Sequence, residues 1–426
     1  MNRRDIARLD RELDQYVESM VAGMGRIERR QALVGYVTGL LLDGERKSIE
    51  PMAARMVESA SEVQAMRQRL QQAVCVADWS DAELYRRIAV KVERELPGLE
   101  AFVFDDTGLP KKGEFSVGVK RQYSGTLGRT DNCQVAVSLH LAADMSSACI
   151  GMRLFLPEDW SADEARRRMC GVPAEISHKP KWKIALDLLD DALAWGVRKH
   201  VVLADAGYGN GSEFRDGLDA RGLPYVVRVN GQPLLWQPES RPTLRPSPKG
   251  KEKYYQDDNY PPLSVAELAK TLSYRKVTWR EGSRGWQSSQ FAAVRIRCAF
   301  AVSNGCPPGP EQWLLCEWPD SEDEPTRFWL STLPTNTSVR TLVRLGKLRW
   351  RVERDYQEMK QEVGLDHFEG RTWRGLHHHF SLCAVAHAFL ALRRALFPPE
   401  GEVDSPDGAT PPPASATQAH RHLSTL

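Results

Sequence analysis

The sequence lacks the features that mark a membrane protein, a disulfide-rich secreted protein or a nucleotide-dependent enzyme. No apolar run approaches the roughly 20 residues that span a bilayer, and the first residues contain no secretory hydrophobic region. The 8 cysteines include no CxxC pair, which favours reduced, buried thiols in a cytoplasmic protein over a disulfide framework or a zinc site. Neither a Gly-Lys-Ser/Thr phosphate loop nor a GxGxxG dinucleotide turn is present, so no nucleotide cofactor is expected.

The composition of the chain indicates a soluble globular protein of two or three domains. Of its 426 residues, 42% are hydrophobic and 27% are charged, which is enough to build a substantial core. The net charge of +2 is close to neutral. A surface that binds nucleic acid therefore has to arise from local clusters of Lys and Arg, because the protein as a whole has no strong positive field.

Hydrophobic residues at helical spacing dominate the first quarter of the chain. Helices are expected around 16–24, 32–41, 62–74 and 81–96. Pro97 and Gly98 end the last of them. Residues 1–98 are thus predicted to form a helical domain, either a purely structural bundle or a domain that binds the ends of a DNA element.

Alternating strand and helix patterns follow. Strands are expected at 101–105, 133–141, 149–156, 200–204 and 225–229, with helices at 183–195 and about 211–221. This order is typical of an α/β fold in which helices flank a mixed sheet. We predict a core of residues 99–229 and 333–397, interrupted by a β-rich insertion at 230–332 and followed by a Pro-rich, disordered tail at 398–426.

A pair of carboxylates ends the first apolar strand. The run Ala-Phe-Val-Phe at 101–104 leads into Asp105 and Asp106, and a Gly and a Pro then turn the chain. Neighbouring residues of a strand point to opposite faces, so only one of the two aspartates can face a given metal ion. We favour Asp105, with Asp106 as the alternate. The structural alternative is a turn in which both side chains cap backbone amides.

Basic and aromatic residues gather just after this strand, among several glycines. They are Lys111, Lys112, Lys120, Arg121 and Tyr123. Cations and an aromatic ring on a flexible backbone suit phosphate contact and base stacking. The alternative is a solvated hairpin without a ligand.

A second apolar strand also ends in an aspartate. Val-Val-Leu-Ala at 201–204 is followed by Asp205, and small residues then open a loop into a helix. By itself this pattern also fits a phosphate-binding turn or a helix cap.

The third carboxylate, Glu353, lies on a predicted helix. At 3.6 residues per turn, Arg349, Glu353 and Lys360 share one face. Leu345, Leu348, Val352, Met359 and Val363 form a neighbouring apolar stripe that can pack on a sheet. The glutamate could then bind a metal ion while the cations hold phosphates, with Arg351 as a further DNA contact. A charged surface helix with internal ion pairs is the alternative. Three converging carboxylates would provide the oxygen ligands that Mg²⁺ prefers.

Taken together, these motifs resemble the DDE transposases of bacterial insertion sequences. The nearest group is that of insertion sequence 701, within the insertion-sequence-4-like superfamily. The segment Asp-Asp-Thr-Gly-Leu-Pro-Lys-Lys-Gly from Asp105 carries the resemblance, together with Asp-Asn-Cys-Gln-Val-Ala-Val from Asp131. The superfamily signature Tyr-x2-Arg-x3-Glu-x6-Lys falls on Arg349, Glu353 and Lys360, with Gly346 at the position of its Tyr.

The resemblance implies a ribonuclease-H-like core and movement of a mobile element by cutting and joining DNA. Asp105, Asp205 and Glu353 would bind two Mg²⁺ or Mn²⁺ ions. Arg349 and Lys360 would hold phosphates near the scissile bond. The implied partners are double-stranded DNA, as terminal inverted repeats and target, and a second copy of the chain in a homodimeric synaptic complex.

Two other functions remain open from the sequence. One is a domesticated metal-dependent nuclease that cuts DNA without joining it. The other is a catalytically silent DNA-binding regulator, although the presence of all three carboxylates speaks against that function. A bacterial protein of any of these kinds is expected in the cytoplasm, in association with the nucleoid.

Overall fold

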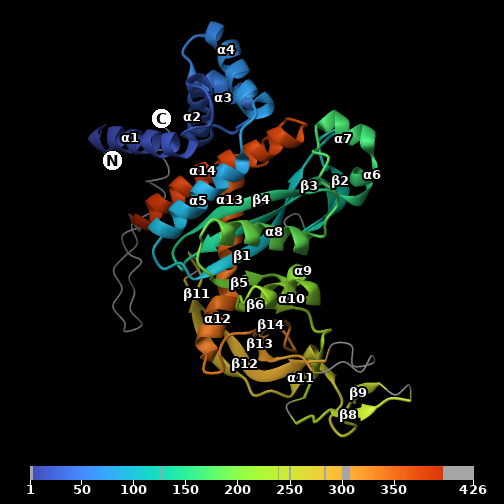
Figure 1. Cartoon of the computed structure of the whole chain (residues 1–426). Coiled ribbons are helices and arrows are strands. Elements are labelled where there is room, and N and C mark those ends of the chain that lie inside the picture. Colours follow the sequence, from blue (N-terminus) through green and yellow to red (C-terminus); the bar gives the residue numbers. More distant parts are fainter. Residues whose placement is uncertain are drawn as a thin grey trace. The chain divides into compact units, whose positions relative to one another are not determined.

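A computed structural model describes residues 3–125, 128–237, 239–248, 251–282, 285–299 and 308–396 (Figure 1). The chain divides into two compact units. Unit 1 comprises 1–99, 105–198 and 351–426, and unit 2 comprises 100–104 and 199–350. Both predicted core segments, 99–229 and 333–397, are therefore shared between the units. The predicted disordered tail at 398–426 lies outside the described residues.

Helices form the N-terminal part of unit 1, as the sequence predicts. They are α1 (Arg3–Val21), α2 (Ile27–Leu41), α3 (Ile49–Met56), α4 (Ala60–Gln71), the π-helical turn η1 (Gln72–Val76) and α5 (Asp81–Glu95). Ser80 caps α5 by accepting a hydrogen bond from the backbone N of Glu83 at 3.1 Å. Helix α3 was not predicted. Its Pro51 lies in the first turn, where the backbone N–H groups have no acceptor within the helix, so the N–H that proline lacks is not missed.

The sheet of unit 1 contains β2 (Lys120–Ser124), β3 (Arg129–Ala142), β4 (Ser147–Phe155) and the second half of β1 (Ala101–Pro110). Strand β3 pairs antiparallel with both β2 and β4. The sequence predicted strand β1 only as far as Asp105, and it missed β2. Residues 120–124 pair with 129–133, so this part of the Gly-rich basic segment is an ordered hairpin strand.

Five further helices belong to unit 1. They are α6 (Glu158–Ala162), α7 (Glu164–Cys170), α8 (Lys181–Ala194), α13 (Trp350–Gln361), which enters unit 1 at Arg351, and α14 (Trp373–Leu396). Helix α8 packs on β3 and β4, and α14 packs on β4, α2 and α5. Figure 1 shows α14 running beside α5 along this sheet. Almost every residue of α14 from 375 to 392 is buried, which explains its lack of a polar face.

Unit 2 contains the first half of β1, which pairs in parallel with a strand later in the chain. Strands β5 (Val201–Ala204) and β6 (Tyr225–Val229) follow in parallel order β1-β5-β6. Two short helices, α9 (Ala206–Gly209) and α10 (Ser212–Ala220), connect them. Strands β1, β5 and β6 are parallel, whereas β3 and β4 are antiparallel. The sheet is therefore mixed, and with its helices it forms the α/β fold that the sequence predicts.

Six strands between Leu234 and Ser331 extend the same sheet. They are β7 (Leu234–Trp236), β10 (Leu263–Ser264), β11 (Arg275–Arg280), β12 (Trp286–Cys298), β13 (Glu311–Trp318) and β14 (Arg327–Ser331). Strand β14 pairs antiparallel with β6, and β13 and β12 follow it. Helix α11 (Val265–Lys270) follows β10, and α12 (Val339–Leu348) packs on β11 and β6. A separate hairpin contains β8 (Thr243–Pro246) and β9 (Glu252–Tyr255).

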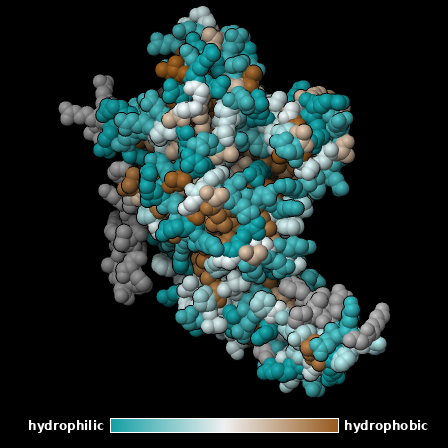
Figure 2. All heavy atoms as spheres, in the orientation of Figure 1, coloured by the Kyte–Doolittle hydropathy of each residue, from teal (hydrophilic) through white to brown (hydrophobic). Residues whose placement is uncertain are grey.

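The single helix predicted from 338 to 361 is divided into α12 and α13, with Arg349 as the C-terminal cap of α12. All five residues of the predicted apolar stripe are buried: Leu345, Leu348, Val352, Met359 and Val363. No helix within the described ranges has both the length and the apolar character needed to cross a membrane. The face in Figure 2 is mainly hydrophilic, with hydrophobic atoms in small groups, as expected when apolar side chains fill the interior.

A buried polar network fixes α13 to the sheet of unit 1. The carboxylate of Asp355 accepts a hydrogen bond from Ser147 Oγ at 2.7 Å and pairs with His140 Nδ1 at 2.7 Å. The next residue, Tyr356, bonds through its hydroxyl to Ser138 Oγ at 2.5 Å. Ser138 and His140 lie on β3 and Ser147 begins β4, so two adjacent residues of one helix hold two strands. Buried polar groups with all partners in place specify one packing arrangement.

The charge of Asp355 is stabilised despite its burial. Burial by itself raises the pKa of this carboxyl, but His387, His140 and Ser147 outweigh that effect and leave the pKa below its ordinary value. A carboxyl whose pKa is lower in the folded protein adds stability above its unfolded pKa. That contribution is lost as the pH falls through the folded pKa.

We expect Asp355→Ala to lower the free energy of unfolding by about 3–5 kcal/mol at pH 7, because it leaves buried partners without their anion. Asp355→Asn, which keeps the shape of the side chain, should cost less. Denaturant unfolding measures both, with the exposed Asp14→Ala in α1 as the control. The deficit of Asp355→Ala should begin to shrink below pH of about 3.9. A deficit independent of pH, or one no larger than that of the control, would contradict an ionised anchor.

Candidate active site

Asp105 lies within β1 at the point where the strand leaves unit 2. The sequence placed it at the end of the strand, but β1 continues to Pro110. Its side chain is half-buried, and Oδ1 accepts a hydrogen bond from the backbone N of Asp106 at 2.8 Å. Asp106 forms an ion pair with Lys181 of α8. That lysine therefore balances the charge of Asp106.

Glu353 lies in the first turn of α13 and is exposed. Two contacts place this helix along β1. Lys360 Nζ donates a hydrogen bond to the carbonyl oxygen of Gly108 at 2.9 Å. The pKa of Tyr356 is raised well above its ordinary value, first by burial and then by the negative charge of Asp105. The hydrogen bond of Lys360 therefore ties the last turn of α13 to β1 within unit 1.

Asp205 belongs to unit 2, where it begins the loop after β5. Its Oδ1 accepts a hydrogen bond from the backbone N of Gly207 at 2.9 Å, so it caps α9, as one sequence interpretation held. The loop packs closely on β6. A Cβ atom at Gly209 would lie 2.1 Å from the carbonyl oxygen of Arg228, which explains the small residues after the aspartate.

An arginine that sequence reasoning missed accompanies Asp205. Burial lowers the pKa of Arg228 on β6, the positive charges of Arg327 and Arg349 lower it further, and the negative charge of Asp205 raises it. Asp205 and these three arginines therefore share one electrostatic environment within unit 2. The signal in the sequence was a single Arg in the otherwise apolar strand Tyr-Val-Val-Arg-Val at 225–229.

The three predicted carboxylates are thus distributed over both units, with Asp105 and Glu353 in unit 1 and Asp205 in unit 2. Within the described residues, no group of three or more His, Cys, Asp or Glu side chains is arranged so that it could hold a metal ion. The donors offered by the predicted set are carboxylate oxygens alone, at half-buried and exposed positions. Their chemistry fits a hard divalent cation such as Mg²⁺ or Mn²⁺ and does not fit zinc, which prefers nitrogen and sulfur.

The predicted DNA contacts after β1 differ in their exposure. Lys111 is partly buried, donates to the carbonyl oxygen of Phe368 at 2.6 Å and has a pKa lowered by burial. Lys112, Lys120, Arg121 and Tyr123 are exposed. Lys120 also pairs with Asp159 at 3.1 Å. Side chains alternate along β2, so Arg121 and Tyr123 share one face of the hairpin, with a cation beside an aromatic ring that is 63% exposed.

A hollow of about 390 Å³ adjoins this segment and adds residues that the sequence did not single out. It is lined by Lys111, Lys112, Phe115, Arg46 and Arg371, among others. The guanidinium of Arg371 lies 5.5 Å from the ring centre of Phe115, which is 56% exposed. Arg46 and Arg371 come from sequence regions far from the motif, so only folding reveals that they join it.

Several cations in and near the helix that carries Glu353 form contacts within the protein. Arg351 is buried, donates from Nε to the carbonyl oxygen of Asp144 at 3.0 Å, and has its pKa lowered by burial to about 10. Lys347 pairs with Glu317 at 2.6 Å, and Arg344 pairs with Glu100. At Lys347 and Arg344 the structure thus has the ion pairs of the alternative interpretation, a charged helix without a ligand. The burial of Arg351 favours a structural role over the direct DNA contact predicted from the sequence.

Comparisons with known proteins place the chain in a family. Residues 19–286 match the family model described as DDE superfamily endonuclease. The chain is also similar to a probable transposase for insertion sequence element IS701 from Microchaete diplosiphon, at 34% identity over 128 residues. That match covers 30% of this chain and 31% of the relative, so it spans about a third of the relative's length. A cryo-EM structure of a piggyBac transposase synaptic complex with hairpin DNA matches with a TM-score of 0.44 at 10% identity, covering 89% of this chain and 71% of that one.

We expect Arg351→Ala to lower the free energy of unfolding by about 1.5–3 kcal/mol, because a charged hydrogen bond to a buried carbonyl is lost. The affinity of the folded variant for duplex DNA, and its dependence on salt, should stay close to wild type. Denaturant unfolding and fluorescence anisotropy measure the two effects, with the exposed Arg354→Ala of the same helix for comparison. A stable variant whose salt dependence is weaker would instead restore Arg351 as a phosphate contact.

Proposed function

The chain belongs to the DDE superfamily of endonucleases, and from that premise we propose that it is a transposase, which cuts DNA at the ends of its insertion sequence and joins the 3′-hydroxyls to target DNA. The strand register is the observation that carries the proposal. Val103 pairs with Leu203, and Asp105 and Asp205 each follow that pair by two residues. Parallel strands carry residues of equal offset to the same edge of a sheet, which supports a common site for the two aspartates.

Glu353 is the third proposed ligand, because it lies on α13, whose Lys360 bonds to Gly108 of the strand that carries Asp105. In this proposal Asp105, Asp205 and Glu353 hold two Mg²⁺ or Mn²⁺ ions, and the ion pair of Asp106 with Lys181 leaves Asp106 as the alternate. The ions, when bound, activate the attacking oxygen and stabilise the leaving 3′ oxygen of an in-line displacement.

The proposed DNA contacts fall into two groups. Arg349 and Lys360 would hold phosphates near the scissile bond, and Arg228, whose pKa responds to the charges of both Arg349 and Asp205, is added to them. Lys112, Lys120, Arg121 and Tyr123 provide exposed positive charge and a ring for the flanking duplex. Lys111, which is partly buried, and Arg351, which is buried, are the remaining DNA contacts predicted from the sequence. The proposed partners are terminal inverted repeats and target DNA, in a homodimeric synaptic complex.

We expect Glu353→Gln to reduce Mg²⁺-dependent nicking of element-end DNA by at least about a hundredfold, since one anionic oxygen of the metal site is lost. Asp205→Ala should have the same effect. The control is Glu362→Gln, an exposed glutamate that follows the same helix. Gel assays measure nicking and anisotropy measures end binding, which should persist in all three variants. Undiminished nicking by Glu353→Gln or Asp205→Ala would remove that residue from the site.

Joining is the activity that separates a transposase from a nuclease. With precut ends carrying free 3′-hydroxyls, we expect the wild-type protein to produce joined products in the presence of Mg²⁺, and Asp205→Ala to produce none. The reason is that cutting and joining use the same carboxylates for successive displacements. Nicking without joining under conditions where ends are bound would favour the nuclease. Binding without either reaction would favour the regulator.

A further inference from the structure

The hairpin formed by β8 and β9 in unit 2 is a two-stranded ribbon separate from the large sheet. Its register pairs Thr243 with Tyr255, Leu244 with Tyr254, Arg245 with Lys253 and Pro246 with Glu252. Among the described residues no further strand pairs with β8 or β9, and every residue of β8 is exposed. A two-stranded ribbon is only marginally stable alone.

Two cations face each other across this ribbon. Arg245 and Lys253 are directly opposite, and side chains in such a pair lie about 5 Å apart at Cβ. Like charges at that spacing destabilise a hairpin. Among the residues that the structure describes, neither cation takes part in an ion pair. The ribbon therefore carries a local repulsion that a bound anion would relieve.

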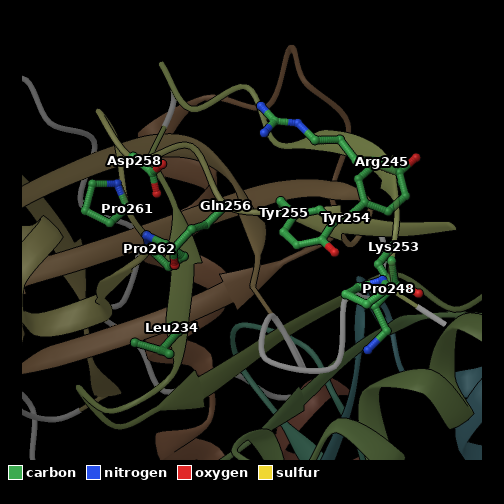
Figure 3. Close-up of a pocket in the computed structure, with 11 residues that line it drawn as sticks. Leu234, Arg245, Pro248, Lys253, Tyr254, Tyr255, Gln256, Asp258, Pro261 and Pro262 are labelled. Atoms are coloured by element: carbon green, nitrogen blue, oxygen red, sulfur yellow. The ribbon is translucent and has the colours of Figure 1, made fainter. Parts of the chain in front are cut away.

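An aromatic side chain completes the same face. Residues two apart on a strand share a face, so Tyr255 lies beside Lys253, and its side chain is 37% exposed. Arg245, Lys253 and Tyr255 also line one hollow of about 710 Å³, together with Tyr254 and Asp258 (Figure 3). Two cations thus outnumber one carboxylate in the lining. Two tyrosine hydroxyls add hydrogen-bond donors.

We propose that this face, which we call the hairpin face and define as Arg245, Lys253 and Tyr255, binds the phosphate backbone of duplex DNA. Paired cations at this spacing match the successive phosphates of one strand, which lie a similar distance apart, and a tyrosine hydroxyl can donate to a phosphate oxygen. The contact carries no base specificity. The inference rests on the proposed function for the identity of DNA as the partner, and it adds a binding surface outside the carboxylate site.

The test is the salt dependence of DNA binding by the full-length protein. Fluorescence anisotropy with a labelled duplex of about 40 base pairs of arbitrary sequence, in EDTA to prevent cleavage, measures affinity from low to moderate salt. We expect Arg245→Ala/Lys253→Ala to weaken binding roughly tenfold and to reduce the log–log salt slope by about two, one for each phosphate contact. Arg245→Lys/Lys253→Arg, which keeps both charges, should restore the slope.

A matched control separates the hairpin face from positive charge in general. Arg275→Ala/Lys276→Ala removes the same two residue types from exposed positions on β11 of the same unit. This control should reduce the log–log salt slope of DNA binding by less than half as much as Arg245→Ala/Lys253→Ala does. Equal effects of the two double variants, or an unchanged slope for Arg245→Ala/Lys253→Ala, would overturn the inference. Thermal unfolding without DNA should show an unchanged or raised midpoint for Arg245→Ala/Lys253→Ala, because a repulsion is removed.

The outcome is independent of the nicking assay. If the wild-type protein binds the duplex with the expected slope but never nicks or joins DNA, the proposed function fails and the hairpin face stands. If nicking and joining occur but the hairpin variants bind like the wild type at every salt concentration, the hairpin face fails and the proposed function stands.

Discussion

The parallel pairing of β1 with β5 is the constraint on which the rest of this structure depends. It aligns Val103 with Leu203 and thereby gives Asp105 and Asp205 the same offset from a common pair. A slip by one residue would turn every side chain of one strand to the other face, so the register is strongly specified by the buried apolar runs on both strands. The chemistry we propose relies on this alignment more than on any single side chain.

The proposed site also requires that α13 keeps its position on the sheet of unit 1. The buried carboxylate of Asp355 holds it there. Asp355 and Tyr356 bond to β3 and β4, while Glu353, two residues earlier, is exposed. One short helix thus presents one carboxylate to solvent and uses another as an internal anchor. Buried hydrogen bonds allow little displacement of Asp355 and Tyr356, and this restricts the backbone position of Glu353 on the same helix.

Charged residues near the motifs therefore separate into two kinds that look alike in the sequence. Arg351, Lys347 and Lys111 are held by a carbonyl oxygen or a carboxylate of the protein itself. Lys112, Arg121 and Arg245 are exposed to solvent. Solvation of an unpaired cation favours exposure, and an internal acceptor compensates for burial only when the fold supplies one. Residue type alone does not report which acceptor is nearby.

Much of the fold followed from local patterns. Apolar alternation and helical spacing identified most of the strands and helices, because those patterns record which face each element buries. Helix α3 was missed because Pro51 reads as a breaker when its place in the first turn is unknown. Strand β2 was missed because its exposed side chains leave a weak apolar signal, and its partner on β3 supplies the stability.

The sequence by itself determined the carboxylates that end or follow apolar elements, the α/β order and the family resemblance, because these depend on residues close together in the chain. Only the tertiary structure decided that Arg228 accompanies Asp205, that Arg46 and Arg371 join Lys112 around one hollow, and that Arg351 is buried. Those relations join segments tens to hundreds of residues apart. Strand pairing and packing create them, and no local pattern encodes such distances.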